Sequence, residues 1–258
     1  LISIFAILYF KSHDDFLYYH LSFIHNLTIN KVEFGLGNFD LAFNHVSSLF
    51  FFHSLFSLPF TIDYFYFVGP ALIMVFSNII LLKSILGFKK KVVFVDFLKI
   101  FIFIFINVFF YRLAEHGTDR SAIILILLNI VIIFQILDEK NLDKSKFENL
   151  IIFLTLIVSL KSFYAIYGVL FLIIYFKFFK IYTISKFYKD FKIINISIIF
   201  GLLILFYNIA YTGCLVYPLA FTCSESFYWS MDLSRIEWAA SFYELWSKAG
   251  ATPAYRVE

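Results

Sequence analysis

Charged residues are scarce in this chain of 258 residues: they make up 15% of it, whereas hydrophobic residues make up 62%. About a quarter of the residues of a soluble domain are typically charged. So few charges exclude an ordinary water-exposed surface, and the composition predicts that lipid is the main solvent of the chain. The sequence also lacks an internal repeat, a low-complexity linker, a Gly-rich phosphate loop and a basic–aromatic pattern suited to nucleic acid.

Cysteine is nearly absent as well. The two cysteines, Cys214 and Cys223, lie close together in a polar segment after the last apolar run. A disulfide between them is one alternative if this segment is extracytoplasmic, and two free thiols are the other.

Long apolar runs dominate what remains. They contain Phe and Ile in unbroken blocks with no polar stripe, which favours membrane helices over amphipathic core helices. The first run starts at Leu1 and is shorter than the roughly 20 residues that span a bilayer. We therefore expect a fragment that begins inside its first transmembrane helix. The runs cover residues 1–10, 64–87, 93–111, 121–137, 149–160, 163–179 and 193–211.

The lysines predict the orientation of these helices, because cytoplasmic loops carry an excess of Lys and Arg. Most lysines lie in the loops around residues 83–91, 140–146 and 177–192. These loops are expected to be cytoplasmic. The loop 11–63, the loop 113–120 and the segment 212–258 are then external. The sequence thus predicts one all-α, polytopic transmembrane domain over residues 1–258, with about six helices after the truncated first one.

The first external loop has two amphipathic stretches, at residues 16–27 and 47–60. On a helical wheel, residues 16–27 place their apolar side chains on one face, while Tyr18 and His25 lie on the polar face. This pattern predicts two helices that lie in the membrane interface with the apolar face toward the lipid.

Asp14 and Asp15 follow the truncated first run directly. Two adjacent carboxylates repel each other, so one of them is a candidate general base near neutral pH. They are also candidate oxygen ligands for a divalent cation. The third alternative is a helix cap, since Asp is favoured at that position.

The other charged groups of the external segments are candidates for binding an anionic substrate. His116 and Arg120 belong to the loop LAEHGTDR, and Lys161 is the charge in the turn between two apolar runs. The planar fork of an arginine suits phosphate oxygens. All six histidines map to external segments, but none of their spacings is typical of a zinc motif. No metal ligand is therefore assigned, and no cofactor beyond the divalent cation left open above.

The layout resembles the GT-C superfamily of membrane glycosyltransferases. The resemblance rests on the acidic pair in HDDFLYYHL, the large first external loop, the short later loops and the segment TGCLVYPLAFTC, which is similar to a segment of bacterial GT-C-like proteins of unassigned function. It implies a sugar donor on a polyprenyl phosphate, a base at Asp14 or Asp15, and phosphate contacts from His116, Arg120 and Lys161. Tyr18 and His25, on the polar face of the first loop, are further candidates for binding the substrate.

The leading hypothesis is therefore an enzyme of the bacterial cytoplasmic membrane that transfers this sugar to a glycan, lipid or protein acceptor at the outer face. The alternatives are a lipid or glycan transporter, or a membrane assembly subunit without catalytic activity. Few polar residues fall within the apolar runs, which favours the enzyme, because transporters need polar groups at mid-membrane depth.

Overall fold

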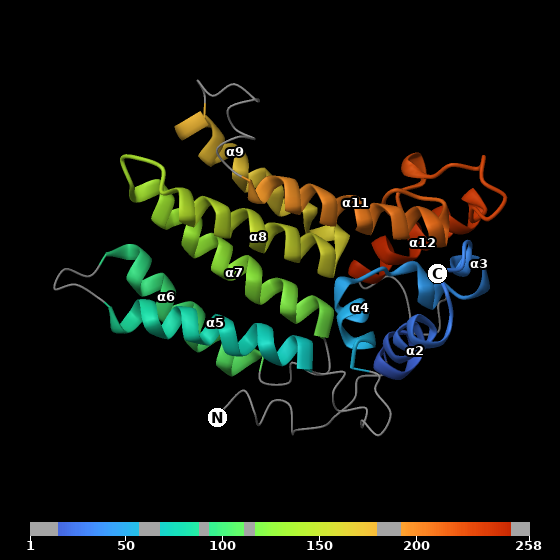
Figure 1. Cartoon of the computed structure of the whole chain (residues 1–258), viewed down its shortest axis with the longest axis horizontal. Coiled ribbons are helices and arrows are strands. Elements are labelled where there is room, and N and C mark those ends of the chain that lie inside the picture. The colour runs from blue at the N-terminus through green and yellow to red at the C-terminus, as the bar shows by residue number, and fades with distance from the viewer. Residues whose placement is uncertain (1–14, 57–67, 88–92, 111–116, 180–191, 249–258) are drawn as a thin grey trace.

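A computed structural model describes residues 15–56, 68–87, 93–110, 117–179 and 192–248. Every element in this part of the chain is helical, and no strand occurs in it. The helices form two parts, a long bundle and a smaller lobe at one end of it (Figure 1). The predicted all-α class is confirmed for the described residues.

The bundle consists of helices that coincide with the predicted apolar runs. Its main core lies between four of them, with fully buried residues such as Met74 and Ile106. Among the described residues, α5, α7 and α11 are long and apolar enough to cross a membrane. The bundle elements are α5 (Val68–Leu86), α6 (Phe94–Phe109), α7 (Gly117–Asp138), α8 (Lys144–Leu160), η5 (Ser162–Val169), α9 (Leu170–Ile174), η6 (Tyr175–Phe179) and α11 (Ile193–Thr212).

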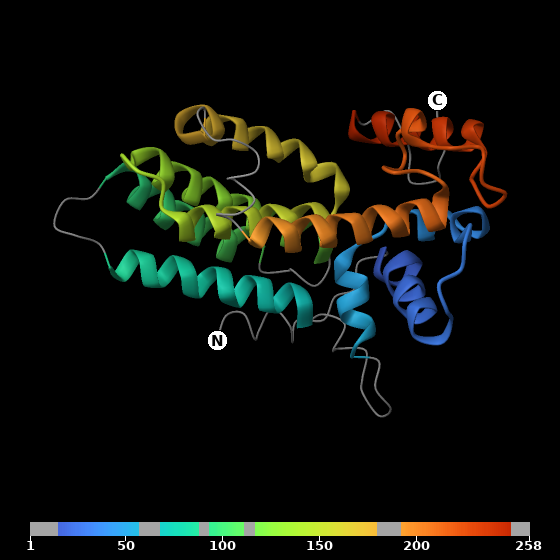
Figure 2. The ribbon, with the colours of Figure 1, turned by 45° about the horizontal axis from the view of Figure 1, so that its top comes forward.

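The lobe is built from segments on both sides of the bundle in sequence. Its elements are η1 (Phe16–His20), α2 (Leu21–Ile29), α3 (Leu36–Phe39), η2 (Leu41–Asn44), α4 (Ser48–Ser54), η7 (Ala220–Thr222) and α12 (Leu233–Ser247). In both ribbon views α11 runs past the ends of α7 and α8 into this lobe (Figures 1 and 2). The projecting end of α11 gives the lobe a core of its own, in which Tyr211 packs with Phe23, Phe43 and Phe50.

This core corrects the interpretation of residues 16–27. Phe23 and Ile24 are fully buried against protein, in contact with α4 and the end of α11, rather than turned toward lipid. Leu17, assigned to the same apolar face, is 63% exposed. An amphipathic helix buries its apolar face against whichever apolar surface is available, and here the projecting end of α11 supplies that surface.

Two left-handed glycines join the lobe to the end of α11. Gly213 (φ 80°) stops the helix, and its N–H donates to the carbonyl of Ile209. Gly35 (φ 78°) starts α3, and its N–H donates to the carbonyl of Ala210 at 2.7 Å. Both positions need a positive φ, which glycine adopts without strain. These bonds use carbonyls that the helix leaves unpaired at its end.

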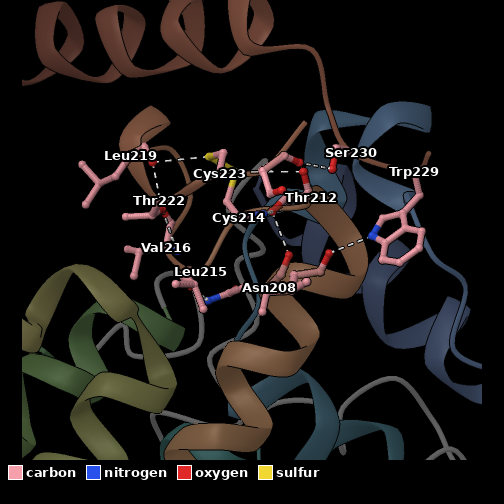
Figure 3. The surroundings of a disulfide bond; sticks show 12 residues. Asn208, Thr212, Cys214, Leu215, Val216, Leu219, Thr222, Cys223, Trp229 and Ser230 are labelled. Carbon is pink, nitrogen blue, oxygen red and sulfur yellow. Dashed lines mark hydrogen bonds between the residues drawn. A yellow bond between two sulfur atoms is a disulfide. The ribbon is translucent and has the colours of Figure 1, made fainter. Parts of the chain in front are cut away.

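The segment after Gly213 is closed by a disulfide between Cys214 and Cys223 (Figure 3). Thr222 supports this loop, since its hydroxyl donates to the carbonyl of Val216 and accepts from the N–H of the same residue. The side-chain amide of Asn208, on α11, donates to the carbonyl of Leu215 at 3.0 Å. Of the two alternatives for the cysteines, the structure contains the disulfide.

The bundle end opposite the lobe carries the lysine-rich turns. Lys146 pairs with Glu139 in the turn between α7 and α8, and Lys177 on η6 donates to the carbonyl of Glu139 at 2.9 Å. The described parts of the lysine-rich loops thus gather at one end. The first loop, the start of α7 and the turn after α8 gather at the lobe end.

Candidate functional site

Charged and hydroxylated side chains meet where the lobe rests on the bundle. Asp119 lies in the first turn of α7, and Lys161 follows the last residue of α8. The Lys161 ammonium lies 2.6 Å from Oδ1 of Asp119, and the Tyr164 hydroxyl donates to the same oxygen at 3.3 Å. The side chains of Asp119 and Lys161 are 39% and 40% exposed, so a ligand can reach the pair.

His45 approaches this pair from the lobe, directly after η2. Its Nε2 is hydrogen-bonded to the hydroxyl of Tyr243 on α12 at 2.6 Å. The rings of Tyr19 and Tyr217 lie 5.9 Å and 6.1 Å from the His45 ring. Protein atoms surround the imidazole of His45, although the residue as a whole is only partly buried.

The pKa of His45 is lowered to about 4, chiefly because burial disfavours the imidazolium. The positive charge of Lys161 lowers it further, and the carboxylate of Asp119 opposes both effects. His45 is therefore neutral near pH 7. The charges of Lys161 and Asp119 thus lie close enough to His45 to act on its pKa.

Two further contacts define the edges of this region. Arg120 follows Asp119, and its guanidinium carbon lies 5.8 Å from the ring centroid of Phe110. The hydroxyls of Ser48 on α4 and Ser159 on α8 are 2.8 Å apart and tie the lobe to the bundle. We call Asp119, Lys161, Tyr164, His45 and Tyr243 the junction cluster.

The residues predicted from the sequence are only partly brought together. Arg120 and Lys161 lie at the junction, as the predicted topology requires. Tyr18 and His25 are exposed on η1 and α2, where the Tyr18 ring contacts that of Tyr19. Asp14 and His116 lie outside the described residues.

Asp15 does not act as a helix cap. Its backbone is helical (φ −56°, ψ −30°), and its side chain makes no capping hydrogen bond. A capping residue has extended backbone angles and accepts a bond from the helix N-terminus. The capping interpretation is therefore wrong for Asp15, whereas its role as a base stays a prediction.

His20 and His53 are buried side chains of the lobe. His53 Nε2 accepts the N–H of Gly69 at 3.3 Å, at the start of α5. Burial lowers the pKa of His53 to about 3, and the neighbouring His20 adds to this effect. In the described part of the chain, no three His, Cys, Asp or Glu side chains form a group that could hold a metal ion.

Sequence reasoning missed three members of the junction cluster, namely His45, Tyr164 and Tyr243. His45 and Tyr243 are 198 residues apart in sequence, so no local pattern relates them. Asp119 was recognisable as a charge of the loop LAEHGTDR, but its pairing with Lys161 depends on the packing of α7 against α8. Chemically, the cluster offers a carboxylate, an ammonium, two phenols and a neutral imidazole.

Comparison with known proteins gives one match. The family described as a domain of unknown function (DUF8201) matches residues 1–255. No curated protein and no solved structure matches the chain.

Proposed function

Since the chain belongs to the DUF8201 family, whose description names no activity, we propose a function from its geometry and its GT-C resemblance. The protein is proposed to be a polytopic membrane glycosyltransferase that moves a sugar from a polyprenyl phosphate to an acceptor hydroxyl. The reaction takes place at the lobe end of the bundle, at the outer face of a bacterial cytoplasmic membrane.

The observation that supports this proposal is the junction cluster itself. Side chains from the first loop, the start of α7, the turn after α8 and α12 converge at one end of an apolar bundle. A lipid phosphate lies at this depth of a bilayer, just beyond the hydrocarbon. Cationic groups placed there can stabilise the phosphate charge that develops when the sugar leaves.

The proposed reaction assigns a role to each group. An acceptor hydroxyl attacks the anomeric carbon of the donor, and the bond from that carbon to the phosphate oxygen breaks. Asp15 or Asp14 takes the hydroxyl proton, as the resemblance implies. Lys161 and Arg120 hold the departing polyprenyl phosphate, while Asp119 and Tyr164 position the Lys161 ammonium.

The transporter alternative finds no comparable support among the described residues. Several polar groups of α5 and α6 bond to one another within the bundle. Asn78 and Asn107 exchange hydrogen bonds between α5 and α6, at 3.2 Å and 2.9 Å. Lys99 pairs with Asp96 at 3.0 Å on α6. The asparagine pair joins two helices and the Lys99–Asp96 pair stays within one, whereas a transport path needs polar groups that face a shared cavity.

Donor turnover by the full-length protein in nanodiscs tests the proposal. With a panel of polyprenyl-phosphate sugars and mixed acceptors, we expect one donor to release polyprenyl phosphate. Lys161→Ala should slow this release about 10²-fold, the loss typical of one donor to a developing oxyanion. Lys248→Ala is the matched control, because Lys248 is exposed and pairs with Glu244 on α12. Movement of intact donor across the bilayer without sugar release would identify a transporter instead.

A further inference from the structure

A row of aromatic rings joins the outer surface of α11 to the lobe. The ring centroids of Phe206 and Phe34 are 6.5 Å apart, and those of Phe34 and Trp229 are 4.8 Å apart. Phe227 stacks on Trp229 at 4.7 Å, and Tyr228 meets it edge-on at 4.9 Å. We call these five residues the aromatic patch.

The patch is exposed although its backbone is firmly held. Tyr228 is 92% exposed, and Phe34 and Phe206 are each 48% exposed. The Trp229 indole N–H donates to the carbonyl of Ile209 at 3.0 Å, at the end of α11. The side-chain amide of Asn38 donates to the Trp229 carbonyl at 2.7 Å. Rigid positioning of exposed aromatic rings indicates a surface that contacts something outside the chain.

An exposed apolar stripe along α11 leads to the aromatic patch. Ile196, Ile199, Leu203 and Phe206 follow one another at helical spacing, and all four are between 48% and 63% exposed. This stripe lies on a helix that is long and apolar enough to cross a membrane. Lipid chains would therefore cover it, and Phe206 is both its last member and the first ring of the aromatic patch.

We propose that the aromatic patch is a membrane-interface anchor, which contacts the lipid headgroups of the bilayer that α11 crosses. Aromatic residues with one apolar and one polar edge are enriched at this level of a membrane. Tyr228 and Trp229 have this character, whereas Phe34 and Phe206 continue the apolar stripe. The anchor fixes the depth of α11 and holds the lobe against the membrane. It requires that α11 crosses the bilayer and does not depend on the proposed glycosyl transfer.

Fluorescence quenching in nanodiscs tests this anchor. The variant W238F/W246F keeps Trp229 as the only tryptophan, and the variant W229F/W246F keeps Trp238, which stacks on Phe242 of α12 and is not part of the patch. The probes are lipids brominated near the headgroup end of the acyl chain and lipids brominated near its far end. We expect the headgroup-end bromines to remove most of the Trp229 emission, the far-end bromines to remove less, and neither to affect Trp238 comparably.

Three results would overturn the proposal. Trp229 emission that is unchanged by brominated lipid but quenched by acrylamide would show that the patch faces water or a soluble partner. Stronger quenching by the far-end bromines would place it in the hydrocarbon core. Equal quenching of Trp229 and Trp238 would show no specific role of the patch. Phe34→Trp in a chain without other tryptophans gives a second reporter of the same surface.

Discussion

His45 and His53 show how individual side chains join distant segments, His45 within the lobe and His53 between the lobe and the bundle. Each is a neutral imidazole that uses a ring nitrogen in a hydrogen bond across two segments, to Tyr243 in one case and to Gly69 in the other. Burial keeps the pKa of both rings well below the ordinary value of 6.5. Protonation of His53 at Nε2 would remove the acceptor for the Gly69 N–H. The contact of His53 with Gly69 therefore depends on a neutral ring.

Acid should consequently destabilise the lobe. Because folding lowers the pKa of His53 from 6.5 to about 3, the unfolded chain binds more protons in this window, and stability falls as the pH falls. Each pH unit in the window costs at most about 1.4 kcal/mol per histidine. Thermal unfolding in detergent, measured from pH 7 to pH 4, should show a declining midpoint. His53→Gln should start lower and decline less steeply, so a variant that declines as steeply as the parent would contradict this assignment.

The acidic pair provides the sharpest test of a single residue. Asp14→Asn and Asp15→Asn should both leave the protein folded and inserted, and at least one should abolish sugar transfer. A carboxamide cannot take the proton of the acceptor hydroxyl, and a general base typically contributes about 10²–10⁴-fold in rate. The measurement is transfer from a polyprenyl-linked donor, with Asp232→Asn on the lobe surface as the control. Near-normal transfer by both variants would remove these carboxylates from the mechanism.

The helices differ in how far their sequences predict them. The bundle helices follow apolar runs, which specify both their existence and their approximate ends. The helices of the lobe carry amphipathic patterns that do not reveal what covers their apolar face. For residues 16–27 a lipid surface and the projecting end of α11 satisfy the same pattern, and only the tertiary structure distinguishes them. The contacts of the junction cluster join segments far apart in sequence, so no local pattern predicted them either.

Gly35 tests how the lobe attaches to α11. A Cβ at this position would lie 2.9 Å from both the Cβ and the carbonyl oxygen of Trp229, and the backbone has φ 78°. Gly35→Ala should therefore lower the free energy of unfolding by roughly 1–3 kcal/mol, which is the range for a strained backbone position.

Gly201→Ala is the matched control for this substitution. Nothing lies within 4 Å of a Cβ there, and the residue is in the middle of α11. Alanine favours helix over glycine by up to about 1 kcal/mol, so this variant should be unchanged or more stable. Thermal unfolding in detergent compares the two. Equal stability of both variants would show that the close contact of Gly35 with Trp229 does not hold the lobe.

At the scale of the whole molecule, the two ends of the bundle differ in chemistry. The lobe end holds the disulfide, the junction cluster and the aromatic patch, and the opposite end holds the lysine-rich turns. Disulfides persist in oxidising compartments, and lysine-rich loops favour the cytoplasm. Two independent features thus favour the same orientation, in which the lobe faces outward.

This orientation gives the last prediction. Ser226→Cys places a thiol on the exposed surface of the lobe, and Lys140→Cys places one on the exposed turn between α7 and α8. In intact cells a membrane-impermeant maleimide should label the first variant and not the second, because only the lobe end is accessible from outside. Permeabilised cells serve as the control, and both variants should react there. The parent chain should stay unlabelled, since Cys214 and Cys223 are joined in the disulfide.

Labelling of Lys140→Cys in intact cells would reverse the orientation. The junction cluster would then face the cytoplasm, where a disulfide is not expected and where the proposed reaction could not take place at the outer face.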